Sequence, residues 1–365
     1  MIHKTSEWVS PGHPDKVADN ISEYILDRII EKDQKVRYAL EVQIKGYEVS
    51  LAGEITTKED IVDGDYAHWV KEAINKIGYT KKYQERFGEK NTICGDDVCV
   101  HCNISKQSPD IAQGVDTDAW GDQGIFFGFF CGETMSGHGR DYATAKAIGK
   151  DLYYAALASD KLGIDIKTQV TVRYDQALVE SQIEKVIVAI PMVAGKEKEA
   201  KKEVLQIVHR HAPKEAKVII NGTGAYCQHG PIADCGTTGR KLAVDFYGGR
   251  SRIGGGSPWT KDGSKADLSL NILAYELARQ SFYELSDIDP HHIEVELSCC
   301  IGKKKILMQT SAYDGDGVLL HTFSEEEAVA PSTLIKRYKL NEPNYMTLCM
   351  EGLFNCASPK EKNVQ

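Results

Sequence analysis

The chain has 365 residues, of which 42% are hydrophobic and 27% are charged, and its formal net charge is -9. This length allows two or three domains, each with its own core, and the excess of acid argues against a nucleic-acid binder, which usually has a basic face. No apolar run approaches the roughly 18 residues of a membrane span, and the first twenty residues lack the apolar core of a secretory signal. We therefore expect a globular cytoplasmic protein that binds neither nucleic acid nor membrane.

The first elements form a helix, a hairpin and a second helix. Residues 15–30 place Val17, Ile21, Ile25 and Ile29 on one face of a helix. Strand-like runs follow at residues 36–44 and 47–55, joined at a tight Lys-Gly turn, and a second helix is expected over residues 66–77.

A cysteine-rich motif comes next. In "CGDDVCVHC", Cys94, Cys99 and Cys102 have a C-x4-C-x2-C spacing, and with Cys131 they are similar to the ligands of a plant-type iron–sulfur cluster. The alternative is a strand, because "DVCVHCNI" alternates and would point Cys99 and Cys102 to opposite faces. In either case, ten cysteines in a chain of this length are expected to be reduced and not a disulfide framework.

The order of helix, hairpin and helix then recurs twice. The second copy is expected as a helix over residues 141–159, strands at 168–174 and 185–191, and a helix at 196–211. The third is expected as a helix over residues 267–285, strands at 292–302 and 305–313, and a helix at 325–338. The helices begin at Asp15, Asp141 and Asp267, which are 126 residues apart in both intervals.

This repeat predicts an α+β fold of three similar domains with pseudo-threefold symmetry, each a mixed sheet covered by helices on one face. The boundaries expected are residues 1–104, 105–230 and 231–356, followed by a disordered tail at 357–365. The uncovered sheet faces should pack on each other or on a partner subunit, because otherwise they would expose large apolar patches.

A local excess of cations suggests an anionic ligand. From Arg240 to Lys265 there are six Lys or Arg against two Asp, beside several glycines. Such a cluster in an acidic protein favours a small polyphosphate. Asp15 and Asp267 lie beside lysines and glycines at two of the helix starts. Each could cap its helix, or could supply hard oxygen to Mg2+ bound with the phosphates.

The motifs together resemble those of the S-adenosylmethionine synthetase (methionine adenosyltransferase) family. The resemblance runs, in the family's order, through "GHPDKVADNIS", "GEITT", "KQSPDIAQGVD", "GDQG", "DIKTQVTV", "GPIADCGTTGRK", "VDFYGG", "GGG" and "KDGSKAD", and it thins after about Ser286. It implies the family's three-domain fold and its reaction, in which ATP and L-methionine give S-adenosylmethionine and the released triphosphate is cleaved to pyrophosphate and phosphate. It also implies a homodimer or a dimer of dimers, with active sites between subunits.

The resemblance implies a role for each matching residue. His13 is expected to bond the oxygen that leaves C5' of ATP, Asp165 to bind the ribose, and Tyr226 to stack on adenine. Two Mg2+ per site are expected at Asp15 and Asp267, and K+ at Glu41, which as an acidic residue in an apolar strand should need a partner if it is buried. The expected phosphate-binding residues are Lys167, Arg240, Lys241, Lys261 and Lys265. The residues expected to hold methionine and orient the nucleoside are Glu54, Gln107, Asp122 and Asp234.

The sequence also departs from the family pattern. Only "TDAW" joins "QGVD" to "GDQG", so the mobile loop over the active site is shortened, and bulky or rigid residues replace the usual ones at Trp8, Pro11, Trp120, Pro258 and Trp259. The alternative function is therefore an inactive relative that binds nucleotide or S-adenosylmethionine as a regulatory subunit. Retention of His13, both aspartates and all the phosphate cations favours the enzyme, because a binding-only protein has little use for a leaving-group catalyst.

Overall fold

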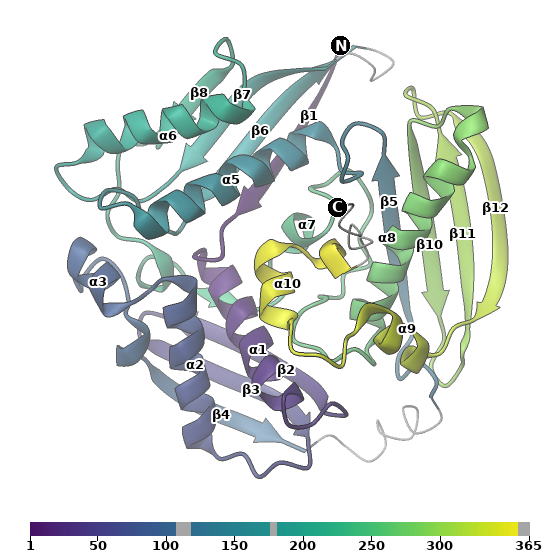
Figure 1. The fold of residues 1–365 in the computed structure, drawn as a ribbon, viewed down its shortest axis with the longest axis horizontal. Coiled ribbons are helices and arrows are strands. Elements are labelled where there is room, and N and C mark those ends of the chain that lie inside the picture. Colours follow the sequence, from purple (N-terminus) through teal and green to yellow (C-terminus); the bar gives the residue numbers. More distant parts are fainter. Residues whose placement is uncertain (107–117, 176–180, 357–365) are drawn as a thin grey trace, which may run out of the picture.

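The computed structural model describes residues 1–106, 118–175 and 181–356. They form three four-stranded sheets, and the helices of each sheet cover one of its faces (Figure 1). The fold class expected from the repeat, α+β with three similar units, is confirmed. The expected tail at residues 357–365 lies outside the described residues, as do residues 107–117, which lead into the loop that is expected to be shortened.

The first unit has the strand order β4-β3-β2-β9. Alternate residues of β2 and β3, such as Val42, Ile44 and Val49, are buried beneath the helices, because a half-covered sheet needs a period of two. β4 pairs parallel to β3 after a crossover through α2 and α3. The bounds are α1 Pro14–Ile30, β2 Arg37–Lys45, β3 Glu48–Thr56, α2 Asp63–Ile77, α3 Lys81–Phe87, β4 Cys99–Ser105 and β9 Gly236–Thr237.

The second unit repeats this plan with the strand order β1-β6-β7-β8. Helix α5 packs on β1 and β6, and α6 makes the crossover that brings β8 parallel to β7. The bounds are β1 Ile2–Val9, α5 Arg140–Ala158, β6 Lys167–Tyr174, β7 Ser181–Ala189, α6 Glu197–His211 and β8 Lys217–Ile220.

The third unit differs from the first two. Its order is β12-β11-β10-β5, every pairing is antiparallel, and β12 follows β11 directly as a hairpin. The helix expected at residues 325–338 is therefore wrong in its first part: residues 319–328 form β12, and the helix α9 begins only at Pro331, a residue favoured at the first helical position. The bounds are β5 Gly124–Cys131, α8 Ala266–Glu284, β10 His292–Cys299, β11 Lys305–Tyr313, β12 Leu319–Ala328 and α9 Pro331–Tyr338.

Each sheet takes one strand from outside its own stretch of sequence. β1 joins the second unit, β5 joins the third and β9 joins the first. The sheets therefore cross the sequence boundaries expected at residues 104 and 230, and the units are tied together by strand pairing as well as by packing.

The three long helices surround the centre of the molecule (Figure 1). α1, α5 and α8 begin at Pro14, Arg140 and Ala266, so the interval of the sequence repeat is kept in the structure. Between them lie the short helices α7 (Leu242–Asp245) and α10 (Tyr345–Glu351) (Figure 1). α1 is buried on almost every side, and not on one face alone, because α2, α10 and two strands surround it.

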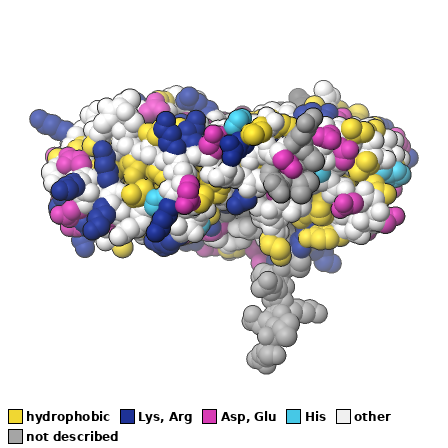
Figure 2. Space-filling view, turned by 90° about the horizontal axis from the view of Figure 1, so that it is seen from above, with side chains coloured by type: hydrophobic (Ala, Val, Ile, Leu, Met, Phe, Trp, Pro, Cys, Tyr) yellow, Lys and Arg dark blue, Asp and Glu magenta, His cyan; other side chains and the backbone are white. Residues whose placement is uncertain are grey.

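Seen from above, the molecule is much wider than it is deep, and side chains of both charges are interspersed over the visible face (Figure 2). Among the described residues, no helix is both long enough and apolar enough to cross a membrane.

Candidate active site

The loop before α1 is held tightly against the segment that precedes β6. The backbone N–H of Ser10 donates to the carbonyl of Ile166, and the Tyr79 hydroxyl donates to the carbonyl of Gly12 at 2.6 Å. A side chain at Gly12 would place its Cβ 2.4 Å from the carbonyl oxygen of Ile164, so only glycine allows this approach. The packing fixes His13 beside the segment that carries Asp165 and Lys167.

His13 caps α1 and is held neutral. Its Nδ1 accepts a hydrogen bond from the backbone N–H of Asp15 at 3.2 Å. Burial, followed by the nearby charge of Lys241, lowers the pKa of His13 to about 4. An imidazole that is neutral and accepts at Nδ1 carries its proton on Nε2, so Nε2 is free to donate to a ligand.

Asp15 does not cap its own helix. Its carboxylate accepts from the backbone N–H of Thr237 at 3.0 Å and forms an ion pair with Lys241, and Arg240 lies 3.7 Å away. Although burial opposes ionisation, the bonds from Lys241 and Thr237 lower the pKa of Asp15 below its usual value. The helix-cap alternative is therefore wrong for this side chain, which faces the cations of the 236–241 segment.

Two buried acids behind the site hold that segment in place, and neither was expected from the sequence. Asp19 accepts from the backbone N–H of Gly239 at 2.9 Å. Lys16 bridges Asp19 and Asp245 at 3.0 and 2.7 Å, and its ammonium lies 4.9 Å from the ring centroid of Trp259. One feature of the sequence could have indicated this support: Lys16 belongs to the motif "GHPDK", and Asp19 follows it by about one helical turn.

Asp165 and Tyr226 complete the first group of site residues. Asp165 accepts from the backbone N–H of Gly230 at 2.8 Å, and the Tyr226 hydroxyl donates to its carbonyl at 3.3 Å. Burial raises the pKa of Asp165 to about 7, and the nearby charge of Asp234 acts in the same direction. Asp234 itself is exposed, and one of its oxygens accepts from the N–H of Cys235.

A second group surrounds the start of α8. Asp267 pairs with Lys261 at 2.6 Å, and Lys265 lies 3.7 Å from Asp262. A Cβ at Gly256 would lie 2.0 Å from an oxygen of Asp267, so the glycine-rich run is needed for the backbone to pass this carboxylate. Asp122 is exposed just before β5. Burial raises the pKa of the Cys299 thiol, and the charges of Asp122 and Asp267 raise it further, so both carboxylates lie near this thiol.

Glu41 links the two groups. It lies on β2 and accepts hydrogen bonds from the hydroxyl of Thr238, on the side of the first group, and from that of Thr260 at 3.2 Å, on the side of the second. The side chain is exposed on the open face of the sheet, not buried, because the alternation of β2 turns it away from the helices. Glu54 is likewise exposed on β3, and Gln107 lies outside the described residues.

Two of the six cations from Arg240 to Lys265 form ion pairs outside the candidate site. The side chain of Arg250 is buried between Asp141 and Glu133, at 2.9 and 2.7 Å. Arg252 pairs with Glu294 and Glu296 on β10. The expectation that the whole excess of charge serves a polyphosphate is therefore wrong for these two residues, whereas Arg240, Lys241, Lys261 and Lys265 remain beside the aspartates of the site.

Comparison with known proteins decides the family. Three models of the S-adenosylmethionine synthetase family match the chain: the N-terminal domain at residues 1–109, the central domain at 117–226 and the C-terminal domain at 228–362. The S-adenosylmethionine synthase of Acholeplasma laidlawii is 32% identical over 96% of this chain and 93% of its own length, and that of Salinibacter ruber is 33% identical over 96% and 92%. The chain belongs to the S-adenosylmethionine synthetase family.

The solved structure of an unusual S-adenosylmethionine synthetase from Campylobacter jejuni is similar throughout. It superposes with a TM-score of 0.87 at 29% identity, over 97% of this chain and 94% of that one. The expected family membership is thus confirmed by sequence and by fold.

Several departures from the family pattern gather in one place. Trp8, Pro11 and Trp259 all line a cavity of about 20 Å³ next to Lys16, beneath the site. Trp120 is fully buried, and its backbone bonds to Lys303 and Gly302 in the β10–β11 turn. Trp8, Pro11 and Trp259 therefore pack beneath the polar site residues, and Trp120 is bonded to the β10–β11 turn.

The iron–sulfur alternative is wrong. Cys99 and Cys102 lie three residues apart on β4 and point to opposite faces, as the strand interpretation predicted, while Cys131 lies on β5 in another sheet. Within the described ranges, these three thiols and that of Cys94 do not come together as a set of metal ligands.

Proposed function

We propose that the chain is a methionine adenosyltransferase, which transfers the adenosyl group of ATP to the sulfur of L-methionine and hydrolyses the released triphosphate to pyrophosphate and phosphate. The observation that carries the proposal is His13. It is neutral, fixed through Nδ1 so that Nε2 can donate, and surrounded by the charges of Asp15, Lys167 and Lys241. A donor of this kind suits an oxygen that becomes anionic during the reaction.

The reaction needs alignment and charge stabilisation, and it needs no general base. The thioether sulfur of methionine has no proton to lose, so it attacks C5' directly while the bond from C5' to the triphosphate oxygen breaks. His13 Nε2 would donate to that oxygen. Lysines and an arginine would bind the phosphates, and ion pairs with Asp15 and Asp267 keep Lys241 and Lys261 in position beforehand. The phosphate-binding set proposed is Lys167, Arg240, Lys241, Lys261 and Lys265.

The side chains present fit the metal ions that the family implies. Asp15 and Asp267 each offer carboxylate oxygen beside phosphate-binding cations, which suits two Mg2+ that keep water and phosphate oxygen as their other ligands. Glu41 with the hydroxyls of Thr238 and Thr260 is an all-oxygen set with one negative charge, which suits K+. When bound, these cations would neutralise part of the triphosphate charge.

The remaining candidates would bind the two ends of the substrates. Asp165 has a carboxylate oxygen for the ribose hydroxyls, and Tyr226 packs beside it with a ring for adenine. Glu54, Gln107, Asp122 and Asp234 are proposed to hold methionine and orient the nucleoside. Asp122 and Asp234 belong to different groups in this chain, so the methionine site would lie between them.

We also propose a homodimer, or a dimer of dimers, with the active sites completed between subunits. Ile125 and Leu307 flank Ser298 in register on the open face of the third sheet, and they are 48% and 47% exposed. A partner subunit would bury them. Mixing His13→Ala protein with Lys261→Ala protein tests this, because a shared site would regain activity in the mixed dimer.

The decisive experiment for the function is incubation of the purified protein with ATP, L-methionine, Mg2+ and K+, with analysis of all products. We expect S-adenosylmethionine, pyrophosphate and phosphate in equal amounts, and none of them without methionine beyond slow hydrolysis of ATP. Folded protein that binds ATP but forms no S-adenosylmethionine would overturn the proposal and favour the regulatory alternative.

A further inference from the structure

Three potential metal ligands gather at one edge of the first sheet, in the cysteine-rich motif that the active site does not use. Glu48 begins β3 and pairs in register with Cys99, which begins β4, and His101 follows two residues later on the same face. His101 Nε2 lies 2.7 Å from an oxygen of Glu48 and 3.8 Å from the sulfur of Cys99. All three ligand atoms lie within 4.8 Å of one another.

This spacing is close to what a tetrahedral metal requires. Zn2+ binds sulfur, nitrogen and oxygen at about 2.0 to 2.3 Å, which places its ligands roughly 3.3 to 3.8 Å apart. Small rotations of three exposed side chains would therefore be enough to bind the ion. A thiolate, an imidazole and a carboxylate form a donor set for a borderline-soft cation, and one that Mg2+ and Ca2+ do not favour.

The described residues of a single chain leave these ligands available. Lys45 stands opposite Glu48 on β2, but its ammonium donates to the carbonyl of Ile232 at 2.9 Å instead of pairing with the carboxylate. Cys99 and His101 point to the open face of the sheet, whereas Cys102 points toward the helices. Glu48 also lies six residues from Glu54 along β3, roughly 20 Å, so this cluster is separate from that part of the proposed methionine site.

We propose that Glu48, Cys99 and His101 form a binding site for one divalent transition-metal ion per chain, of the zinc type, with water as the fourth ligand. The proposal is independent of the active site. It also accounts for the "CVHC" motif: the ligand set combines one of its cysteines with its histidine and with an acid from the neighbouring strand, in place of the cysteines alone.

Cobalt(II) tests the site because it reports on the ligand atoms. The protein, without an affinity tag and stripped with a chelator, is titrated with Co2+, and a thiolate-to-cobalt charge-transfer absorption is expected to saturate at one equivalent per chain. Zn2+ should displace the signal and excess Mg2+ should not. Cobalt bound by the aspartates of the active site would lack this absorption, because their ligands are oxygen.

Variants identify the ligands. Cys99→Ser should abolish the charge-transfer absorption, and Cys300→Ser, at another exposed cysteine, should leave it unchanged. His101→Ala should weaken Co2+ binding by more than about tenfold, since loss of an outer partner alone typically costs about 10- to 100-fold. Absence of the absorption in the parent protein, its persistence in Cys99→Ser, or unchanged affinity in His101→Ala would each overturn the proposal.

Discussion

Asp15 and Asp141 occupy equivalent places in two units, but the cations that they face differ in type and in burial. Each is the second residue of a long helix, and each faces a cation from the segment between β9 and α8. Asp15 pairs with Lys241, beside the more exposed Arg240. Asp141 pairs with the buried Arg250, and its other oxygen lies 2.7 Å from the hydroxyl of Ser6.

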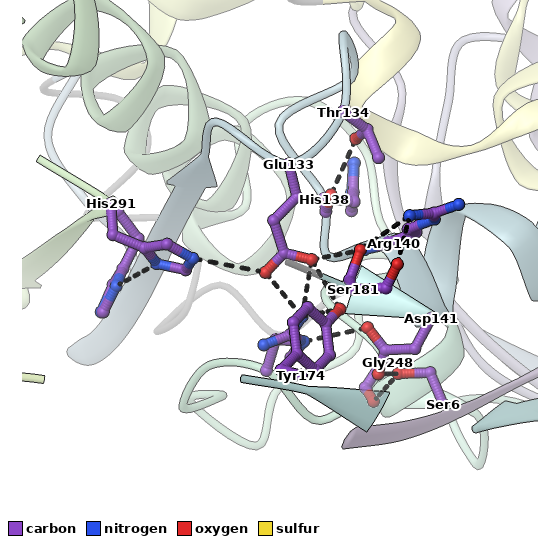
Figure 3. Close-up of polar contacts among 12 residues, drawn as sticks. Ser6, Glu133, Thr134, His138, Arg140, Asp141, Tyr174, Ser181, Gly248 and His291 are labelled. Carbon is purple, nitrogen blue, oxygen red and sulfur yellow. Dashed lines mark hydrogen bonds and ion pairs between the residues drawn. The ribbon is translucent and has the colours of Figure 1, made fainter. Parts of the chain in front are cut away.

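The polar groups around Asp141 form a closed network, in which they bond to one another. Glu133 accepts from Arg250, from the Tyr174 hydroxyl at 2.7 Å and from the backbone N–H of Arg140 at 2.9 Å (Figure 3). An arginine with several fixed donors suits a permanent contact of this kind, whereas a lysine on a flexible chain can move from a carboxylate to a phosphate. The same helix-start aspartate therefore serves structure in the second unit and, in our proposal, chemistry in the first and third.

The largest effect should come from breaking the closed network. Arg250→Ala leaves Asp141 and Glu133 buried without their cation, and we expect it to lower the free energy of unfolding by about 3 to 5 kcal/mol. Urea denaturation of the purified variant measures the change. If the variant does not fold well enough to be purified, Glu133→Gln, which keeps the shape of the side chain, should still show a clear loss.

Arg252 provides the matched control two residues away. Its side chain is 58% exposed, against 7% for Arg250, although both pair with acids. Arg252→Ala should change the free energy of unfolding by no more than about 1 kcal/mol. Equal losses in the two variants would contradict the distinction between the buried network and the exposed pair.

His13→Ala should have the next largest effect, on rate and not on stability. Removing a donor that acts on a developing anion typically slows the chemical step by about 10²- to 10³-fold, while the affinity for ATP changes little. Single-turnover kinetics separate the two quantities. His13→Asn, which retains an N–H donor, should recover part of the rate, and near-normal turnover in His13→Ala would remove the residue from the mechanism.

Asp15→Asn and Asp267→Asn should each raise the Mg2+ concentration needed for activity. A contact between a charged group and its partner contributes about 1.5 to 3 kcal/mol, so we expect a shift of roughly ten- to a hundredfold. Asp141→Asn should instead reduce stability and leave the magnesium titration unchanged. A magnesium titration that shifts equally in all three variants would show that the three aspartates do not divide into two classes.

The fold was predictable where the signal was local. The helices α1, α5 and α8 and the hairpins between them follow from apolar residues at helical or alternating spacing. β12 was missed because all of its side chains are exposed, as in an edge strand, so "LLHTFSEEEA" has no buried alternation to read. β1 and β5 pair with strands more than 150 residues away, and no local pattern carries that information.

The candidate site shows the same limit. Sequence motifs identified His13, Asp15 and the lysines as candidates, and the structure places His13, Asp15 and Lys241 together. The support given by Asp19 and Lys16 was not predicted, because their partners Gly239 and Asp245 are distant in sequence and meet them only in the folded chain. For the same reason Arg250 could not be told from the other cations, since exposed and buried arginines look alike in sequence.

Asp165 offers the smallest test, because it is a half-buried acid that, among the described residues, forms no ion pair like that of Asp141. Burial raises its pKa to about 7, so the folded, ligand-free protein exchanges this proton near neutral pH. Only the ionised carboxylate can accept from both ribose hydroxyls without losing an oxygen to its own proton. The affinity for ATP should therefore rise a few-fold as the pH increases through about 7. Calorimetric titration with a non-hydrolysable ATP analogue measures this rise.

Asp165→Asn separates this effect from the titration of the nucleotide itself, since the amide keeps the shape of the side chain but has no proton to exchange. The variant should lose the part of the pH dependence that belongs to the protein and keep the part that belongs to the analogue.

The contribution of Asp165 to the free energy of unfolding should change with pH in the opposite direction to the affinity for ATP. Because the pKa is higher in the folded chain than in the unfolded one, the contribution of Asp165 is fully present below the unfolded pKa, near 3.8, and is lost as the pH rises through about 7. Urea midpoints across this range should therefore fall less steeply with rising pH in Asp165→Asn than in the parent protein. Parallel curves for the two proteins, in binding and in unfolding, would show that the Asp165 carboxyl does not titrate in this range.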